Sequence, residues 1–465
     1  MSTEKTIEVD YLVKGAGATG MAFVDTLLSE TDATVAMVDR HDRPGGHWND
    51  AYSFVRLHQP AASYGVNSRP LGTGVKDHVG LNKGYYELAS GQEVLSHFDL
   101  TMNERFLPSG RVHYFPMSEL ADDGIATGLL SGKRTRIKAK KFVDGTYSKV
   151  NVPSVCKPRY AISPEATVVP VNDLPRAAGR FAEYVVIGSG KTGMDACIWL
   201  LQNGAEPNAI RWIMPRDYWL LPRKNFQPGM EFMLPLAQRL AAQAEVIATA
   251  TTVDELFLNL ERCGNVCRID SNVTPTGYHC AVVSELELEE LRRIRNVVRL
   301  GHVTRVDKDS VVLERGTIPA GPEVLHIDCS ATGIPRLPSR PVFENERITL
   351  QFVRMCQPVF SAAFIAHVEA AFDDEAEKNR ICAPQAIPDT PADFLEVLQI
   401  DLANRQCWGR YPELGDWMVE SRLEGSRRLL RAIPEECPEA LPYLQRYQAT
   451  IGEAQANIRR LLGQV

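Results

Sequence analysis

Two glycine-rich turns carry the residues of this sequence whose spacing suits them best to chemistry. The segments GAGATG at 15–20 and GSGKTG at 188–193 share the pattern Gly-x-Gly-x-x-Gly and begin 173 residues apart. Glycines at this spacing allow a tight turn, a close approach of a pyrophosphate to the backbone, and close packing of helix on strand. The helix that follows points unpaired N–H groups at the phosphates. The repeat therefore predicts two dinucleotide-binding sites.

The first turn lies between an apolar stretch at 9–13 and a helix-spaced apolar run at 21–28. A second apolar strand, 34–38, ends on Asp39, which lies 24 residues after Gly15. An acid roughly 20 residues beyond the first glycine suits the ribose hydroxyls of an adenosine. The cofactor-binding residues predicted for this site are Gly15, Gly17, Ala18, Thr19, Gly20 and Asp39.

The second turn is preceded by the strand 184–187 and followed by a helix at 194–201 and a strand at 210–214. Arg216 takes the position at which an acid would bind the ribose. A guanidinium can bind a 2′-phosphate through two parallel N–H···O hydrogen bonds, so this position favours NADPH. Asp217 is a complication, because it either meets the ribose or pairs with Arg216. The predicted NADPH-binding residues are Gly188, Gly190, Lys191, Thr192, Gly193, Arg216 and Arg223.

The segment after Asp39, RHDRPGGHW at 40–48, resembles the corresponding segment of flavin-containing and Baeyer–Villiger monooxygenases. In those proteins a Gly-Gly-x-Trp element lies against the isoalloxazine ring. The resemblance implies that the first site holds FAD, with Arg40, Gly46, His47 and Trp48 among its binding residues. Taken alone, the glycine pair at 45–46 favours an ordinary loop.

The same resemblance implies a catalytic role for Gln59, with His58 beside it. The family carries an asparagine in a similarly placed tract, next to the reactive edge of the flavin, and Gln59 is the nearest match. An amide there would hydrogen-bond a flavin C4a-hydroperoxide and delay the loss of peroxide. The alternative is that His58 and Gln59 belong to a polar loop before Pro60.

The order of motifs predicts an α/β fold with two Rossmann-type dinucleotide-binding domains and a helical C-terminal region. Strand 324–328, followed by Ala-Thr-Gly at 331–333, resembles the point at which such flavoproteins return to the FAD domain. The NADPH domain is therefore expected to be inserted in the FAD domain. The expected parts are 1–155 (FAD, first part), 165–325 (NADPH) and 326–465 (FAD, second part, with the helical region). Further helices are expected at 85–100, 233–247 and 283–295.

Over about residues 8 to 335 the resemblance implies an FAD- and NADPH-dependent monooxygenase acting on a small organic substrate with molecular oxygen. The alternatives are an FAD oxidoreductase or oxidase without oxygen transfer, and a nucleotide-sensing flavoprotein. The family's FxGxxxHxxxY/W fingerprint should stand before the second turn, but VPVNDLPR at 169–176 has no histidine. Either Asn172 or Arg176 would then supply the missing linker contacts.

Composition narrows the class of protein further. With 465 residues, 44% hydrophobic and 23% charged residues, the chain suits two or three globular domains. A net charge of −7 argues against a nucleic-acid or anionic-membrane surface, and the sequence has no apolar signal core, so a cytoplasmic protein is expected. All ten cysteines are expected to be free thiols, and no metal site is indicated. His367 either faces substrate or has an ordinary partner, and the C-terminal helices shape either the substrate pocket or a dimer face.

Overall fold

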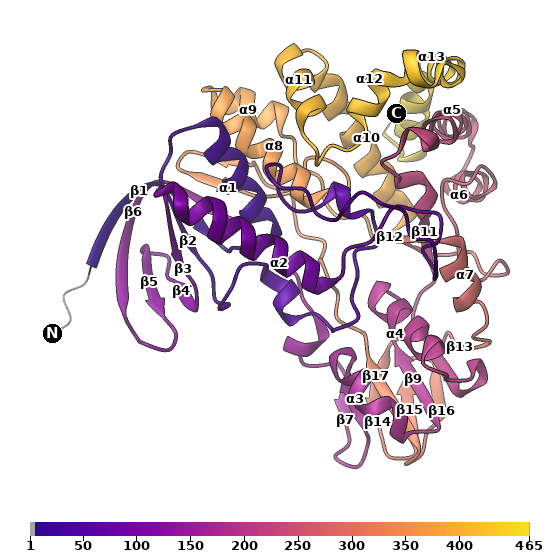
Figure 1. Ribbon diagram of the computed structural model, residues 1–465. Helices are drawn as coiled ribbons and strands as arrows, with labels where there is room; N and C mark the ends of the chain where they lie inside the picture. Colours follow the sequence, from indigo (N-terminus) through magenta and orange to yellow (C-terminus); the bar gives the residue numbers. More distant parts are fainter. Residues whose placement is uncertain (1–4, 465) are drawn as a thin grey trace.

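The computed structural model describes residues 5–464 as a mixed α/β protein with several parallel sheets (Figure 1). Two of these sheets hold the predicted glycine turns, and they lie in separate parts of the molecule. Helices from the C-terminal half gather above and beside them in the view of Figure 1. No helix of residues 5–464 is long and apolar enough to span a membrane.

The first sheet has the order β18-β19-β6-β1-β2-β3, with β5 also paired to β6 and β4 paired to β5. Strands β1, β2, β3 and β6 run parallel, and β19 joins β6 in the same direction. The bounds are β1 Lys5–Lys14, β2 Val35–Val38, β3 Val112–Phe115, β4 Ser118–Leu120, β5 Ile125–Gly128, β6 Arg134–Asp144, β18 Phe343–Glu344 and β19 Arg347–Thr349.

Helix α1 (Ala18–Glu30) connects β1 to β2 and is buried along most of its length. It is covered because α8 (Pro358–Ala371), an almost wholly apolar helix from the far end of the chain, packs against it. Helix α2 (Gly91–Thr101) adds Val94, Leu95 and Phe98 to the same core. Helix α1, which begins at the first glycine turn, thus shares one apolar core with the sheet, α8 and α2.

The second sheet has the order β13-β10-β9-β17-β8, and all of its strands are parallel. A four-stranded sheet, β16-β15-β14-β7, lies beside it and shares an apolar core with it. The bounds are β7 Ala161–Ile162, β8 Val168–Pro170, β9 Glu183–Ile187, β10 Ile210–Ile213, β13 Asn296–Val298, β14 Val303–Val306, β15 Ser310–Leu313, β16 Gly316–Pro319 and β17 Val324–Asp328. The helices of this part are α3 (Leu174–Ala177), α4 (Lys191–Gln202) and α7 (Glu285–Leu291).

The two sheets repeat one arrangement of strands. The strand before each glycine turn, β1 or β9, lies between the strand that follows the helix, β2 or β10, and a strand from much later in the chain, β6 or β17. A third parallel strand, β3 or β13, completes the same edge in both. After β17 the chain returns to the first sheet as β18 and β19.

A third region combines the two-stranded sheet of β11 (Tyr218–Pro222) and β12 (Gly277–Val283) with helices from both halves of the chain. Helix α5 (Met233–Thr249) packs against the C-terminal α13 (Leu441–Leu461), and α6 (Val253–Arg262) packs against α10 (Pro391–Trp408). The remaining helices are α9 (Glu375–Ile381), α11 (Pro412–Glu420) and α12 (Arg427–Glu436).

Capping explains where two predicted helices differ from the structure. Ser90 and Glu93 form a capping box, so α2 begins at Gly91 and not at residue 85. Ser284 and Glu287 form another, so β12 runs to Val283 and only Glu285–Leu291 is helical in the predicted stretch 283–295. The helix expected at 233–247 is present as α5.

The expectation that all ten cysteines are free is wrong for one pair. Cys280 in β12 and Cys356 in front of α8 form a disulfide, with their Cα atoms 6.2 Å apart. The remaining eight cysteines are free. The pair joins residues 76 positions apart, a separation that no short cysteine motif in the sequence indicates.

Candidate functional site

The first glycine turn has the backbone geometry that its sequence predicts. Gly15 has a φ of +95°, and a Cβ at Gly20 would overlap the Gly15 carbonyl oxygen, so neither position accepts a side chain. Gly17 is the N-cap of α1, with no side chain hydrogen-bonded to the first turn of the helix. The N–H groups of that turn, which includes Ala18 and Thr19, therefore remain available for an anionic ligand.

The second turn has the same conformation. Gly188 has a φ of +125°, and a Cβ at Gly193 would overlap the Gly188 carbonyl oxygen. Gly190 caps α4 with φ −76° and ψ −178°, against −75° and −178° for Gly17, and again no side chain caps the helix. Each turn thus presents an uncapped helix N-terminus at the carboxyl edge of a parallel sheet.

A matching pair of turns stands beside the two glycine turns. β6 ends on Asp144, whose carboxylate accepts hydrogen bonds from the N–H and hydroxyl of Thr146, at 3.0 and 2.8 Å. β17 ends on Asp328, which binds the N–H and hydroxyl of Ser330 in the same way, at 3.2 and 2.6 Å. The hydroxyl of Thr19 donates to the Gly145 carbonyl at 3.2 Å, which joins the glycine turn to its neighbour.

Asp39 lies against the first glycine turn. One carboxylate oxygen accepts the N–H of Ala16 at 2.6 Å, and the other faces the Nδ1 atom of His41 at 3.0 Å. The Nε2 atom of His41 is 2.9 Å from Asp50, and Arg40 approaches Asp50 at 3.6 Å. The hydrogen bond to Asp39 is the main reason that the pKa of His41 is raised. The cationic form of His41 would thus bridge the two acids.

The Gly-Gly-x-Trp segment also contacts the first turn. The Gly45 N–H donates to the Ala16 carbonyl at 2.9 Å, and a Cβ at Gly46 would come within 2.9 Å of the Gly17 Cα. Gly46 begins a short 3-10 helix, Gly46–Asp50. The backbone of Gly46 therefore lies directly over Gly17, which leaves no room for a side chain at Gly46.

His47 and Trp48 extend this contact. The indole N–H of Trp48 donates to the hydroxyl of Tyr64 at 2.9 Å, and the ring of His47 stacks on Trp48. Burial lowers the pKa of His47 to about 4, so its imidazole is neutral near pH 7.

Residues 50–60 reach from the first unit to the second. The hydroxyl of Tyr52 donates to Asp195 of α4 at 2.6 Å, and the same carboxylate pairs with Lys191. Thr192 follows Lys191 in the first turn of α4. Helix α4, which follows the second glycine turn, is therefore hydrogen-bonded to the segment that follows the first.

Asn172 and Arg176 were the two residues expected to supply the linker contacts, and only Asn172 reaches the first unit. The amide N–H of Asn172 donates to the Asp50 carbonyl at 3.0 Å, whereas Arg176 is largely exposed and lies 3.9 Å from Asp173. Asn172 and not Arg176 therefore joins the linker to the first unit.

His58 and Gln59 lie where three regions meet. The Nδ1 atom of His58 accepts the Val282 N–H at 3.2 Å, and burial, with the charges of Lys191 and Arg223, lowers its pKa to about 3. The amide oxygen of Gln59 accepts a hydrogen bond from Gln357 at 3.2 Å. His58 is thus a neutral acceptor, and Gln59 has its amide N–H₂ free to act as a donor.

Arg216 follows β10 and lies next to the second glycine turn, because Ser189 of that turn donates to the Arg216 carbonyl at 2.9 Å. Its guanidinium, one third exposed, is 2.6 Å from Asp389, and this hydrogen bond raises its pKa. Asp217 does not pair with Arg216. It holds Arg299 through two bonds of 2.8 and 3.0 Å.

Arg223 is misplaced for the role predicted from the sequence. It is fully buried and binds the His58 carbonyl, Asn82, the Val282 carbonyl and Glu287, the last at 2.6 Å. Four of the five guanidinium N–H donors are used in these bonds and the side chain is fully buried, which closes it to a 2′-phosphate. Arg223 instead joins the loop around Asn82 to β12 and α7.

Of the two expectations for His367, a place facing substrate or an ordinary structural partner, the structure shows the structural partner. Its Nδ1 atom is 2.7 Å from Glu30 of α1, and its ring stacks on Trp417 at 4.6 Å between centroids. These contacts hold α8 and α11 on the back of α1, away from both glycine turns.

Several contacts of the site were absent from the sequence-based expectations: Tyr52 with Asp195, Gln357 with Gln59, and Asp389 with Arg216. Each joins residues more than 140 positions apart. No local pattern in the sequence indicates them, since they arise only when the two units and the C-terminal region pack together.

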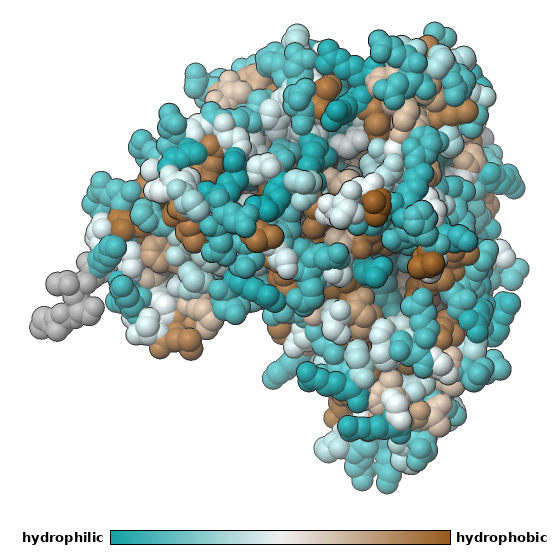
Figure 2. All heavy atoms as spheres, in the orientation of Figure 1, coloured by the Kyte–Doolittle hydropathy of each residue, from teal (hydrophilic) through white to brown (hydrophobic). Residues whose placement is uncertain are grey.

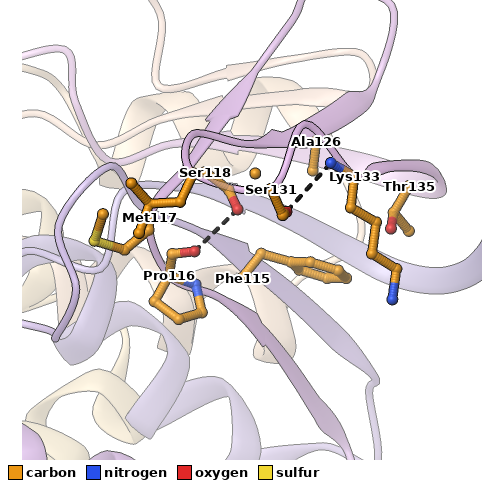
Figure 3. A pocket seen from close by; sticks show the side chains of 10 residues that line it. Phe115, Pro116, Met117, Ser118, Ala126, Ser131, Lys133 and Thr135 are labelled. Atoms are coloured by element: carbon orange, nitrogen blue, oxygen red, sulfur yellow. Dashed lines mark hydrogen bonds between the residues drawn. The ribbon is translucent and has the colours of Figure 1, made fainter.

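A cavity of about 210 Å³ lies in the first unit beside the hairpin of β5 and β6 (Figure 3). Phe115, Met117 and Leu130 line it together with the polar residues Ser118 and Lys133. The Ser118 N–H donates to the Asp39 carbonyl, so the cavity borders the end of β2. None of the site residues predicted from the sequence lines it.

The face of the molecule drawn in Figure 2 carries no single large hydrophobic patch among the described residues. Figure 2 shows a mostly hydrophilic exterior with small, separate hydrophobic patches, one of them at the end of the β5–β6 hairpin. Leu129 and Leu130, 52% and 86% exposed, lie in that turn.

The fold and the site define a class: a mixed α/β protein with two parallel sheets, each carrying a strand, a glycine turn and an uncapped helix. No protein-family model matches the chain. The proteins "Uncharacterized protein Rv2000" of Mycobacterium tuberculosis and "Uncharacterized protein Mb2023" of Mycobacterium bovis are each 47% identical to it over 458 residues, covering 98% of this chain and 85% of theirs. The chain therefore belongs to the same family as these mycobacterial proteins.

Solved structures of flavin monooxygenases resemble the chain more distantly. Cyclohexanone-bound cyclohexanone monooxygenase is 13% identical with a TM-score of 0.49, covering 93% of this chain and 98% of its own. The flavin-containing monooxygenase of Stenotrophomonas maltophilia is 13% identical with a TM-score of 0.48, covering 78% and 97%.

Proposed function

We propose that this chain is an FAD-dependent, NADPH-using oxidoreductase of the monooxygenase type, with FAD at the first glycine turn and NADPH at the second. One observation carries the proposal: Gly17 and Gly190 cap α1 and α4 with the same backbone angles, and neither helix has a side-chain cap. Two such helix N-termini suit two pyrophosphates. A protein with a single nucleotide site would need only one uncapped helix N-terminus of this kind.

The two units correspond to Rossmann-type domains, and the proposed NADPH domain is inserted in the FAD domain. The pairing of β19 with β6 supports this, because the chain rejoins the first sheet only after the second is complete. The proposed parts remain 1–155, 165–325 and 326–465.

At the first site, Gly17 and Gly46 would flank the pyrophosphate and Asp39 would accept the ribose hydroxyls. The fit rests on the close approach of the two glycine backbones and on the position of Asp39 against Ala16. Arg40, His47 and Trp48 would line the same ligand, with His47 kept neutral by burial.

At the second site, Gly190 and the first turn of α4 would bind the pyrophosphate, and Lys191 would contribute a cation. Arg216 would bind the 2′-phosphate, which requires it to leave Asp389. Arg223 has no part in this site, because its guanidinium is buried and paired.

Bound FAD would supply hydride acceptance from NADPH and reaction with molecular oxygen. The chain would hold the two cofactors together through residues 50–60, which contact α4 of the second unit through Tyr52 and β12 of the third region through His58. Gln59 would donate an amide N–H toward the flavin while Gln357 fixes its other end. His58, with its pKa lowered to about 3, would stay neutral and would not act as a general acid. Because its Nδ1 atom accepts the Val282 N–H, its Nε2 atom would carry the proton and act as a hydrogen-bond donor. A small organic molecule would be the substrate.

A second candidate is an FAD oxidoreductase or oxidase without oxygen transfer. The linker before the second glycine turn favours this second candidate. Residues 169–176 lack the histidine of the monooxygenase fingerprint, and Asn172 supplies the contact to Asp50. The two candidates share both cofactors and differ only in the fate of oxygen.

The test is to supply the purified protein with FAD and measure NADPH oxidation and hydrogen peroxide release, without and then with small ketone, sulfide and amine substrates under labelled oxygen. Label in a product supports the monooxygenase. NADPH oxidation that yields only peroxide, with every substrate, supports the second candidate. A protein that neither binds FAD nor oxidises NADPH refutes both.

A further inference from the structure

The disulfide between Cys280 and Cys356 joins parts of the molecule that are otherwise held together by non-covalent contacts. Cys280 belongs to β12, in the region built on β11, and Cys356 lies in the segment that leads from the first sheet into α8. The Cα separation of 6.2 Å lies within the range of about 4.4–6.8 Å that a disulfide spans without backbone movement. Both residues are partly exposed, so a thiol in solution has access to them.

Each cysteine keeps its place through contacts that do not involve the disulfide. Next to Cys280, the Tyr278 N–H donates to the Asp389 carbonyl at 2.9 Å. Next to Cys356, the Met355 N–H donates to the Asp401 carboxylate at 3.0 Å. These bonds would survive reduction, so the two thiols would remain close enough to pair again.

The neighbours of the two cysteines connect the pair to both proposed cofactor regions. His279, beside Cys280, stacks on Tyr218 at 3.9 Å, and Tyr218 in turn lies against Arg216. Gln357, beside Cys356, donates to Gln59. Cys356 also has a φ of +56°, a left-handed conformation that is unfavourable for a residue with a side chain. Release of the disulfide would free this residue to relax.

We propose that Cys280 and Cys356 form a reversible redox-active pair that locks β12 to the segment in front of α8. A thiol of the glutathione class would reduce it: a thiolate attacks one sulfur to form a mixed disulfide, a second thiol releases it, and two protein thiols and one external disulfide result. The reverse exchange with the external disulfide restores the lock. This chemistry is independent of the proposed cofactors.

The test is a redox titration of the full chain in glutathione buffers, followed by acid quenching and differential alkylation with mass spectrometry. The two cysteines should change together in a two-electron transition, so that the ratio of reduced to oxidised pair rises tenfold for each tenfold rise in the ratio of squared thiol to disulfide concentration. Cys156 and Cys407, partly exposed and free, are internal controls that should form no internal disulfide.

Two results would overturn the proposal. If Cys280 and Cys356 are alkylated in the native protein at every buffer ratio, they do not pair. If they resist reduction until the protein is denatured, the disulfide is a permanent cross-link and not a reversible one.

The lock is tested separately by hydrogen exchange of the oxidised and reduced protein. Exchange in 278–283 and 354–358 should be faster after reduction, and the variant Cys280→Ser should match the reduced protein in both buffers. Cys263→Ser, a change at a free cysteine of the same region, should match the oxidised wild type. Equal exchange in oxidised and reduced protein would show that the pair locks nothing.

Discussion

Replacement of Gly190 with alanine should weaken NADPH binding and leave the fold unchanged. The backbone angles of Gly190, φ −76° and ψ −178°, are open to alanine, and a Cβ there would meet no heavy atom within 4 Å. The added methyl group would instead point at the position proposed for the pyrophosphate. Gly193→Ala is a poor test, because its Cβ would overlap the Gly188 carbonyl oxygen and disturb the turn itself.

The size of the effect follows from the contacts that the methyl group would prevent. A hydrogen bond to a charged group contributes roughly 1.5–3 kcal/mol, and each 1.4 kcal/mol is about tenfold in affinity. Loss of one backbone contact to the pyrophosphate should therefore raise the Kd for NADP⁺ by about 10- to 100-fold. The change in melting temperature of the free protein should be within about one degree, since no contact of the free protein is lost.

The assay is isothermal titration of the FAD-supplied protein with NADP⁺, with a thermal melt of each variant. Gly179→Ala is the matched control, because Gly179 lies just before β9 and its Cβ would also meet nothing within 4 Å. The control should bind as the wild type does. A folded Gly190→Ala protein with wild-type affinity would refute the assignment of this turn to a dinucleotide.

The remaining predictions concern the first site, the 2′-phosphate, the flavin edge and the response to acid. Gly17→Ala should abolish FAD retention, because the added methyl group would enter the position proposed for the pyrophosphate. It should not unfold the protein, because its Cβ would lie 3.5 Å from the Gly46 Cα, an ordinary contact distance; full FAD occupancy on extraction would argue against this site. Arg216→Ala should raise the KM for NADPH by about tenfold and leave the KM for NADH nearly unchanged. The expected rise is small for a bond to a charged group because Asp389 already competes for the guanidinium. An equal rise in KM for both cofactors would exclude a contact of Arg216 with the 2′-phosphate. Gln59→Ala should increase peroxide release per NADPH with little change in flavin reduction, and an unchanged ratio would return this residue to a structural role. The melting temperature should fall as the pH is lowered from about 6.5 toward 4, because burial lowers the pKa of five histidines. Four of them are His47, His97 and His279, with a pKa of about 4, and His58, with a pKa of about 3; the fifth is His326. In that range the unfolded chain binds protons that the folded chain does not, at about 1.4 kcal/mol per pH unit for each of the four. A melting temperature that is flat from pH 7 to 5 would contradict this.

The parts of the site that were predictable from the sequence are those with a local physical cause. Gly15 and Gly20 are required by the backbone of a turn six residues long, and the turn forms with the conformation that its spacing indicates. Ser90 and Ser284 illustrate the same principle at helix starts, where a capping box of four residues sets a boundary that apolar periodicity does not locate.

The parts that could not be predicted depend on packing between distant segments. Arg216 and Arg223 are seven residues apart and look equivalent in the sequence, but one is one third exposed beside the glycine turn and the other is wholly buried against Glu287. The pairing of Cys280 with Cys356 likewise requires β12 to meet the segment before α8. Neither outcome has a signal in local composition or spacing.

The central claim is that FAD at the first turn receives hydride from NADPH at the second, and anaerobic titration of the FAD-loaded protein with NADPH tests it most directly. The visible absorbance of the flavin should be lost with about one equivalent of NADPH in the wild type, and only at a large excess in Gly190→Ala. A protein that takes up no FAD, or whose bound flavin NADPH does not reduce, would contradict the account.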